Sequence, residues 1–127
     1  MSRWCPCSSG DAFDTCCEPY LRGDASAPTA EKLMRSRFTA FAVGDADYLR
    51  ASWHPATVPH ELDLDSDQRW YRLDIVGVDA GGLFDDEGTV EFRAHYKHPE
   101  GAGTMSEVSR FVRVGGRWLY LDGVVSR

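Results

Sequence analysis

The feature that most constrains this chain is a cluster of cysteines at its N-terminus. The sequence has 127 residues and four cysteines, and all four lie within residues 1–17. They are Cys5, Cys7, Cys16 and Cys17. Structural zinc sites prefer four tetrahedral ligands, and four thiolates make a closed site with no position for water. The cluster therefore predicts a bound zinc ion with a structural or partner-binding role.

The spacing of the cysteines suits such a site. Cys5 and Cys7 can place two sulfurs on one side of an ion, and the loop after them lets the second pair close from the other side. Gly10 can supply the unusual backbone angles of that turn. Two disulfides, reactive redox thiols and small core residues are alternative interpretations, although a C-x-x-C redox motif is absent.

The start of the sequence predicts a cytoplasmic protein without membrane insertion. Met1 to Arg3 leads directly into the cysteines, with no apolar stretch of the kind that secretory signals contain. The longest apolar runs are too short to span a bilayer. In the cytoplasm thiols stay reduced, so clustered cysteines there are typical metal ligands.

The charge argues against nucleic acid as a partner. The formal net charge is −6, and the first 24 residues carry two arginines against four acidic residues. Binding to nucleic-acid phosphates depends on neutralisation by basic side chains. The acidic balance therefore makes nucleic-acid binding the least favoured of the functions considered for this chain.

Beyond the cluster, the sequence predicts two helices. Thr29 is a suitable N-cap for a helix that begins at Ala30, and Gly44 fits just after its end. A second, shorter helix is expected from Asp45. It should end near Trp53, because Pro55 disfavours helical geometry in His54, the residue before it.

The rest of the chain predicts an antiparallel sheet and its connections. Residues 18–28 are typical of a linker, and residues 55–68 are expected to be mainly loop. Strands are predicted over residues 70–78 and 90–97, where apolar and polar side chains alternate in the second. Gly115–Gly116 marks a two-residue hairpin turn between the last two strands. Helices followed by antiparallel strands indicate an α+β domain.

The hairpin turn also predicts which side chains share a face. The expected cross-strand partners are Val114 and Arg117, Arg113 and Trp118, Phe111 and Tyr120, and Ser109 and Asp122. One face then carries Glu107, Ser109, Phe111, Trp118, Tyr120 and Asp122. A one-residue bulge would break this assignment.

The cysteine pattern resembles a known zinc motif. Cys5-Pro6-Cys7-Ser8-Ser9-Gly10 followed by Cys16-Cys17 is similar to the SEC-C motif, which is found at the C-terminus of the SecA translocation motor and in many other bacterial proteins. The resemblance implies a small module that docks onto protein partners or ribosomes.

Nearly the whole chain resembles the YchJ family of small bacterial proteins. The matching stretches are Cys5–Cys7, Leu33–Phe38, Asp45–Leu49, Trp53–Pro55, Glu107–Phe111, Gly116–Trp118 and Asp122–Gly123. The resemblance implies a cone-shaped, nuclear transport factor 2-like (cystatin-like) α+β domain at residues 29–127, with helices packed on a curved antiparallel sheet. A zinc-binding segment at residues 1–24 would precede it. The family has no established activity.

A curved sheet covered by helices forms a pocket that can bind a ligand. The polar candidates are Arg35, Arg37, His54, Glu107, Ser109 and Asp122, with Trp53, Trp118 and Tyr120 as walls. A carboxylate among aromatic side chains can have a raised pKa and act as a general base. The sequence has no glycine-rich phosphate loop, nucleophile elbow or H-E-x-x-H helix, so it leaves open whether the protein is an enzyme.

The same candidates have structural interpretations. Arg35 and Glu107 can form a buried ion pair between helix and sheet. His54 can bond locally at the end of the second helix, and the hairpin aromatics can be core residues. Asp122 before a glycine is typical of a turn. The acidic run at 63–67 lacks the spacing of a calcium loop and is expected to be solvated.

Two functional hypotheses follow. In the first, the zinc segment docks onto a protein or ribosomal partner, and the cone is its body. In the second, the cone pocket binds a small molecule or performs acid–base chemistry. A partner that depends on Cys16 and Cys17 would favour the first, and a bound metabolite would favour the second.

Overall fold

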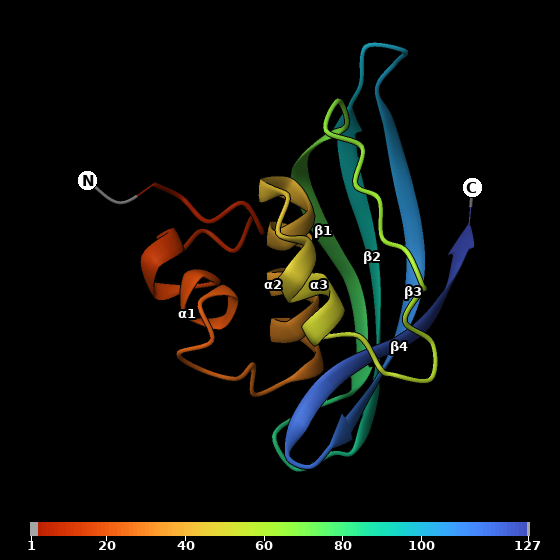
Figure 1. Ribbon diagram of the computed structural model, residues 1–127. Coiled ribbons are helices and arrows are strands. Elements are labelled where there is room, and N and C mark those ends of the chain that lie inside the picture. The colour runs from red at the N-terminus through yellow and green to blue at the C-terminus, as the bar shows by residue number, and fades with distance from the viewer. Residues whose placement is uncertain (1–2, 127) are drawn as a thin grey trace.

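The computed structural model describes residues 3–126. The elements are η1 (Phe13–Thr15), α1 (Glu18–Leu21), α2 (Ala30–Val43), α3 (Ala46–Ala51), β1 (Arg69–Ala80), β2 (Glu87–Lys97), β3 (Gly103–Val114) and β4 (Arg117–Ser126). Figure 1 shows these elements in layers, with α2 and α3 between the sheet and the N-terminal residues that include α1. We call residues 3–24 the cysteine segment. Within the described residues, no helix is long and apolar enough to span a membrane.

Helix α2 begins and ends where the sequence predicts. The Thr29 side chain accepts a hydrogen bond from the backbone N–H of Lys32 at 3.1 Å, and Gly44 follows the last turn as the C-cap. Helix α3 begins in the same way, with Asp45 accepting from the N–H of Tyr48 at 3.0 Å. These caps fix which side chains of α2 face the sheet and which face the cysteine segment.

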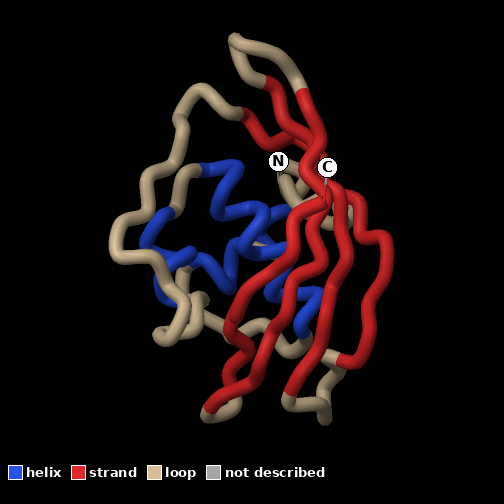
Figure 2. Tube along the Cα trace, turned by 90° about the vertical axis from the view of Figure 1, so that its right-hand side faces the viewer, coloured by secondary structure: helices blue, strands red, loops and turns tan. Residues whose placement is uncertain are grey.

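The four strands form an antiparallel sheet in the order β1-β2-β3-β4. Figure 2 shows the strands side by side, with the helices on one face of the sheet. Gly115 and Gly116 form the predicted turn, with φ of 60° and 82°, a conformation that glycine adopts at little cost. Residues 55–68 contain no helix or strand. The predicted α+β fold is therefore confirmed.

The main hydrophobic core lies between α2 and the sheet. Its large buried members are Leu33, Met34, Phe38, Leu73, Val90, Phe92, Phe111 and Trp118. The indole Nε1 of Trp118 donates a hydrogen bond to the carbonyl of Pro28 at 3.1 Å. This bond joins the final hairpin to the residues that lead into α2. Trp118 is therefore a buried core aromatic.

The register of the final hairpin is correct near the turn and wrong beyond it. Three predicted pairs are present, and the last of them is Phe111 with Tyr120. The next residue of β3, Arg110, lies opposite Asp122, because Leu121 is an extra residue on β4. This bulge moves Asp122 to the outer face of the sheet, so its predicted pairing with Ser109 is wrong.

The physical cause of the bulge lies outside the hairpin. The N–H of Tyr120 donates to the carbonyl of Ser52 at 2.8 Å, and the carbonyl of Tyr120 accepts from the N–H of His54, also at 2.8 Å. The hydroxyl of Thr57 donates to the carbonyl of Leu121. The chain after α3 therefore bonds to the backbone of β4 at the point where the regular ladder between β3 and β4 breaks.

Two smaller expectations also need correction. Residues 18–28 are not all linker, because Glu18–Leu21 forms helix α1, with Pro19 in the first turn where proline is tolerated. Asp122 and Gly123 do not form a turn but lie inside β4. In both cases a local turn signal is overridden by the pairing or packing of the neighbouring residues.

Candidate functional site

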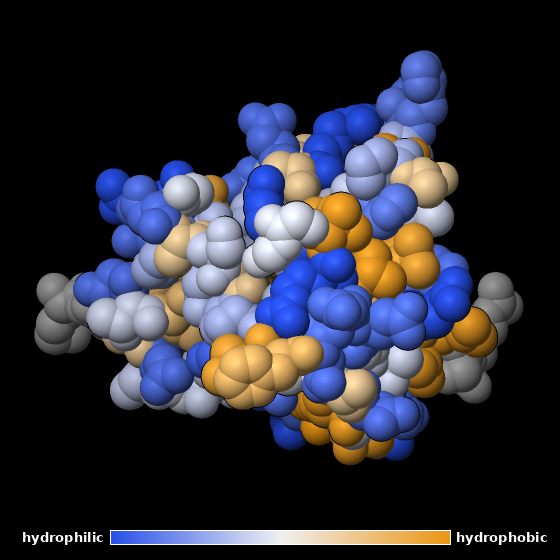
Figure 3. All heavy atoms as spheres, turned by 90° about the horizontal axis from the view of Figure 1, so that it is seen from below, coloured by the Kyte–Doolittle hydropathy of each residue, from blue (hydrophilic) through white to orange (hydrophobic). Residues whose placement is uncertain are grey.

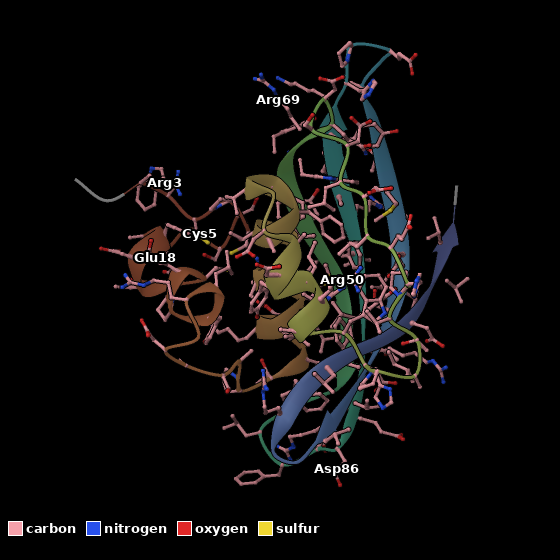
Figure 4. All side chains as sticks on the ribbon, in the orientation of Figure 1. Arg3, Cys5, Glu18, Arg50, Arg69 and Asp86 are labelled. Carbon is pink, nitrogen blue, oxygen red and sulfur yellow. The ribbon has the colours of Figure 1, made fainter. Side chains whose placement is uncertain are left out.

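A short backbone ribbon positions the first two cysteines. Hydrogen bonds of 2.9 Å join residues 3–5 to residues 11–13, and Gly10 in the connecting turn has φ of 88°. The turn η1 then leads to Cys16, and Cys17 is the N-cap of helix α1. Figure 4 places Cys5 on the side of this segment that faces α2. Two separate local structures therefore bring the two cysteine pairs together.

The four sulfurs have the spacing of a tetrahedral metal site. All four thiols are free and buried, and their Sγ atoms lie within 4.8 Å of one another. The Sγ–Sγ distance is 3.6 Å between Cys7 and Cys16, and 4.0 Å between Cys16 and Cys17. A zinc–sulfur bond of about 2.3 Å implies about 3.8 Å between the sulfurs of a tetrahedron. The donor set therefore fits a thiophilic divalent ion.

The thiols also influence each other's protonation. Hydrogen bonds from Cys17 and Cys5 hold the pKa of the Cys7 thiol well below its usual range. Burial raises the pKa of Cys16 to about 11, and hydrogen bonds to Cys5 and Cys7 raise the pKa of Cys17. A cation that binds such a cluster displaces protons from its thiols.

Hydroxyl groups lie beside two of the sulfurs. The Oγ1 of Thr39, on α2, is 3.7 Å from Sγ of Cys5. The Oγ of Ser9 is 3.2 Å from Sγ of Cys16 and also accepts from the N–H of Asp11 at 3.2 Å. Four thiolates on a divalent ion carry a net charge of about −2, so nearby donors stabilise the set.

Arg35 of α2 lies beside the cysteine cluster rather than at a cavity. Its Nη1 donates to the carbonyl of Cys7 at 2.9 Å, and its Nε bonds to Glu31 at 3.1 Å. The expectations that Arg35 lines the pocket or pairs with Glu107 are therefore wrong. Arg35 and Arg37 are two residues apart on a helix, so their side chains point to opposite sides.

A cavity of about 210 Å³ lies between α2 and the inner face of the sheet. We call it the cone cavity. Its apolar lining is Met34, Phe38, Phe41, Trp70, Phe92, Ala94 and Met105. Its polar lining is Arg37, Trp53, Glu107, Ser109 and Tyr120. These five polar or aromatic residues are the candidates from the sequence that the fold does bring together.

Arg37 is a buried cation at this cavity, with 3% of its surface exposed. Its Nη1 donates to the carbonyl of Leu49 at 2.9 Å and to the hydroxyl of Ser52 at 2.7 Å. Its guanidinium lies 4.7 Å from the ring centre of Trp53 and 4.6 Å from that of Tyr120. Burial lowers the pKa of Arg37 to about 10, so it stays charged at neutral pH.

Glu107 supplies the opposite charge. Its Oε2 accepts hydrogen bonds from the hydroxyl of Ser109 and, at 3.2 Å, from the hydroxyl of Tyr120. Burial and the Glu107 carboxylate raise the pKa of Tyr120 above its usual range. Gly123 makes room for this carboxylate, because a Cβ there would lie 2.6 Å from Cδ of Glu107. Among the described residues, Arg37 and Glu107 form no direct ion pair with each other or with another group.

Trp53 brings an unused donor to the same cavity. Its indole Nε1 is buried and has no hydrogen-bond partner among residues 3–126. Its ring packs edge-on against Tyr120, with 5.1 Å between the ring centres. Nearly all buried polar groups in proteins are hydrogen-bonded, so a lone indole N–H beside a cavity needs an explanation.

The comparisons with known proteins identify the family. The model of a family domain described as the middle, NTF2-like domain of YchJ matches residues 29–123. The chain belongs to the YchJ family. A UPF0225 protein of Streptomyces coelicolor is 49% identical over 119 residues, which covers 94% of this chain and 93% of the relative. A UPF0225 protein of Corynebacterium glutamicum is also 49% identical, over 125 residues that cover 98% of this chain and 99% of the relative.

Solved structures support the same assignment. The solution structure of RPA3114 from Rhodopseudomonas palustris, described as a SEC-C motif containing protein, matches with a TM-score of 0.84 and 31% identity over 100% of both chains. A crystal structure of a SEC-C motif containing protein from Psychrobacter arcticus matches with a TM-score of 0.76 and 30% identity, covering 97% of this chain and 82% of that one. The resemblance to a YchJ-type fold with an N-terminal SEC-C-like cluster is thus confirmed.

Three more sequence candidates lie outside the cone cavity. His54 bonds locally, with its Nδ1 accepting from the N–H of Ala56 at 3.0 Å. Trp118 is in the core, as described above. Asp122 forms an ion pair with Arg110 on the outer face, at 2.5 Å, and this arginine holds the pKa of Asp122 below its usual range. The prediction that these residues line the pocket is wrong.

The sequence does not reveal the apolar lining of the cavity. Met34, Phe38 and Phe41 recur at helical spacing, and Phe92 and Ala94 alternate along a strand. Such patterns predict a buried face, but they do not say whether the face is filled by other side chains or left open. The signal for a core is therefore the same as the signal for a cavity wall.

The acidic loop brings one ligand atom each of Asp65, Asp67 and His98 within 4.8 Å of one another. Asp65 and Asp67 are exposed, and the two oxygens of Asp65 are bonded to the N–H of Asp67 at 2.9 Å and to Nε2 of His98 at 3.0 Å. The other ring nitrogen of His98 accepts from the N–H of Glu100 at 3.0 Å. These contacts join the loop to the β2–β3 connection, in agreement with the interpretation of the acidic run as a solvated loop.

Apolar side chains are also exposed at the end of the sheet where two turns meet. Leu83 and Phe84, in the β1–β2 connection, and Val114, before the β3–β4 turn, are all largely exposed. Figure 3 shows this end of the molecule, with hydrophobic atoms gathered beside charged ones. None of these residues contributes to the cysteine cluster, so substitutions here serve as controls.

Proposed function

We propose that this protein binds one zinc ion through Cys5, Cys7, Cys16 and Cys17, and that the zinc-held cysteine segment docks onto a protein partner in the cytoplasm. The sulfur spacing and the neighbouring donors support the choice of ion. Zinc in a closed site of this kind supplies folding energy rather than catalysis. The division into a zinc segment at residues 1–24 and a domain at residues 29–127 is part of the proposal.

The observation that carries the docking role is the exposure of Trp4. Its side chain is 76% exposed, although tryptophan is among the residues that proteins bury most. Trp4 stands on the hydrogen-bonded ribbon that also holds Cys5, so its position depends on the metal centre. Tryptophan is enriched among the residues that dominate binding energy in protein interfaces.

The charge around Trp4 suggests the nature of the partner. Asp11 and Asp14 are exposed on the same segment, and Figure 4 shows Arg3 and Glu18 on its outer side. The segment carries a net negative charge. We therefore propose a partner with an apolar pocket bordered by basic side chains. Ribosomal proteins fit this description, whereas RNA does not.

Affinity capture from the cytosol of the source cells tests this proposal. The baits are the wild type, Trp4→Ala, Cys16→Ser/Cys17→Ser, and Phe84→Ala as a control that removes an exposed aromatic (94% exposed) from the other end of the molecule. We expect a basic protein to be held by the wild type and Phe84→Ala and lost from the other two. Truncation of an interface tryptophan costs about 2 kcal/mol, or roughly thirtyfold in affinity. Equal capture by Trp4→Ala would contradict the docking role.

A second candidate function is the binding of a small molecule in the cone cavity, with or without acid–base chemistry by Glu107. The specific observation in its favour is that Arg37 and Glu107, of opposite charge, line one cavity without pairing. Charges that are withdrawn from water without an ion-pair partner are costly, so such an arrangement favours a site with a purpose other than stability.

A further inference from the structure

The cone cavity contains more hydrogen-bonding capacity than the protein uses. Among the described residues, no group accepts from Nε or Nη2 of Arg37 or from Nε1 of Trp53, and no group donates to Oε1 of Glu107. The hydroxyls of Ser109 and Tyr120 are already bonded to Glu107, and the rest of the lining is apolar. A ligand that completes this site must therefore accept at one atom, donate at another, and be hydrocarbon elsewhere.

We infer that the cone cavity binds a small uncharged molecule with a hydrocarbon body of the size of two fused rings. One end of this molecule carries a polar group, such as a hydroxyl, phenol or amide, that both accepts and donates hydrogen bonds. This inference rests on the second candidate function above, and it names the chemical class of the ligand. It concerns binding and assigns no reaction.

The size of the body follows from the volume of the cavity. An apolar protein cavity of about 150 Å³ holds benzene. The cone cavity, at about 210 Å³, is larger by the volume of a few carbon atoms. Two fused rings with one substituent therefore fit better than a single ring, and a nucleotide or a long acyl chain does not fit.

The shape of the body follows from the walls. Trp70 meets the ring of Phe38 edge-on, with 6.4 Å between the ring centres, and meets that of Tyr96 with 5.2 Å between centres. Met34 and Met105 supply flexible side chains to the same lining. Edge-on aromatic rings and thioethers pack well against the face and edge of a flat hydrocarbon ring. A planar ligand is thus favoured over a branched aliphatic one.

The uncharged state of the ligand follows from the two opposite charges at the cavity, the buried Arg37 and the half-buried Glu107. Arg37 and Glu107 together contribute no net charge, so a neutral ligand leaves the cavity balanced. An anion would be attracted by Arg37 but repelled by Glu107, and a cation would experience the reverse. Either one would also lose its hydration on entering an apolar cavity, and no net field compensates that loss.

A series of probes on one ring system tests the inference in the zinc-loaded full chain. The probes are 2-naphthol (neutral, accepts and donates), 2-methoxynaphthalene (neutral, accepts only), 2-naphthoate (anion) and 2-naphthylmethylammonium (cation). Binding is followed by titration, monitored through the ¹H–¹⁵N resonance of the Trp53 indole. We expect 2-naphthol to bind about tenfold more tightly than either charged probe and several-fold more tightly than 2-methoxynaphthalene.

Substitution of Glu107 provides the second arm. Glu107→Gln keeps the size of the side chain and an oxygen that accepts from Ser109 and Tyr120, but it leaves Arg37 as an uncompensated cation. We expect this variant to bind 2-naphthoate about tenfold more tightly than the wild type does. The control is Glu91→Gln, which makes the same charge change at an exposed position on the outer face of β2 and should leave all four affinities unchanged.

The outcomes separate the inference from the function on which it rests. If no probe shifts the Trp53 indole resonance, the cavity is not a ligand site, and both are overturned. If the probes bind with equal affinity, and Glu107→Gln does not favour the anion, the cavity binds ligands but the inferred ligand class is wrong. Tighter binding of 2-naphthoate than of 2-naphthol to the wild type would overturn the inferred class in the same way.

Discussion

Replacement of Gly123 by alanine tests whether the absence of a Cβ at this position makes room for the Glu107 carboxylate. A Cβ at residue 123 would lie 2.6 Å from Cδ and 2.9 Å from Cγ of Glu107, well inside van der Waals contact. Glu107 is a flexible side chain, so it would move aside rather than displace the backbone. It would then give up its hydrogen bonds to Ser109 and Tyr120.

The magnitude follows from the groups left behind. Ser109 is fully buried, and a buried hydroxyl without a partner costs about 1–3 kcal/mol. Alanine in place of glycine returns about 0.5 kcal/mol by restricting the unfolded chain, because Gly123 does not require a positive φ. We therefore expect Gly123→Ala to lower the free energy of unfolding by about 1–2 kcal/mol.

A double-mutant cycle with Glu107→Ala isolates this cause. In the Glu107→Ala background the carboxylate is absent and Ser109 has already lost its partner, so Gly123→Ala should be neutral or stabilising by about 0.5 kcal/mol. The expected coupling is about 2 kcal/mol, measured by urea unfolding of the four zinc-loaded proteins. Equal effects of Gly123→Ala in both backgrounds would refute the account of this contact.

Three further predictions concern contacts elsewhere in the molecule. Arg35→Ala removes the bond to the carbonyl of Cys7 and should speed amide hydrogen exchange in residues 5–17 without changing exchange in the strands. Lys32→Ala, at an exposed position on the same helix, should leave the exchange of residues 5–17 unchanged. Unchanged exchange in Arg35→Ala would contradict the role of Arg35. Trp118→Phe removes the bond to Pro28 and should cost about 1 kcal/mol of unfolding free energy, and no loss in urea unfolding would argue against that bond. Arg110 lowers the pKa of Asp122, so this pair stabilises the fold above the ordinary aspartate pKa of 3.8 and loses that effect as the pH falls through the lowered value. Below pH 3.8 the Tm of Asp122→Asn should therefore fall less than the Tm of the wild type. Parallel curves of Tm against pH would show that the pair contributes nothing to stability.

Much of the fold could be predicted because its signals are local. The caps of α2 and α3 depend on side chains within three residues of the backbone groups that they bond, and the glycine pair of the last hairpin depends on its own backbone angles. The proximity of the four cysteines follows from their spacing in a short segment. For these features, the sequence contains both partners of each interaction within a few residues.

The parts that could not be predicted depend on contacts between distant segments. The bulge at Leu121 accompanies bonds from β4 to residues 52–57, and no pattern within the hairpin reveals it. One extra residue reverses the alternation of faces, so the hairpin pattern predicts Asp122 on the cavity side whereas it lies on the outer surface. The position of Arg35 is hidden from the sequence for a similar reason, because its partner is a backbone carbonyl of the cysteine segment.

The most direct test of the central claim is a measurement of zinc in the purified full chain, by elemental analysis together with zinc K-edge X-ray absorption. We predict one zinc per chain, bound by four sulfurs at about 2.3 Å. We also predict that Cys16→Ser/Cys17→Ser loses the zinc while the strands stay folded. A wild type with nitrogen or oxygen ligands on the metal, or a double variant that keeps its full zinc content, would contradict the assignment of the metal centre and, with it, the zinc-held docking segment.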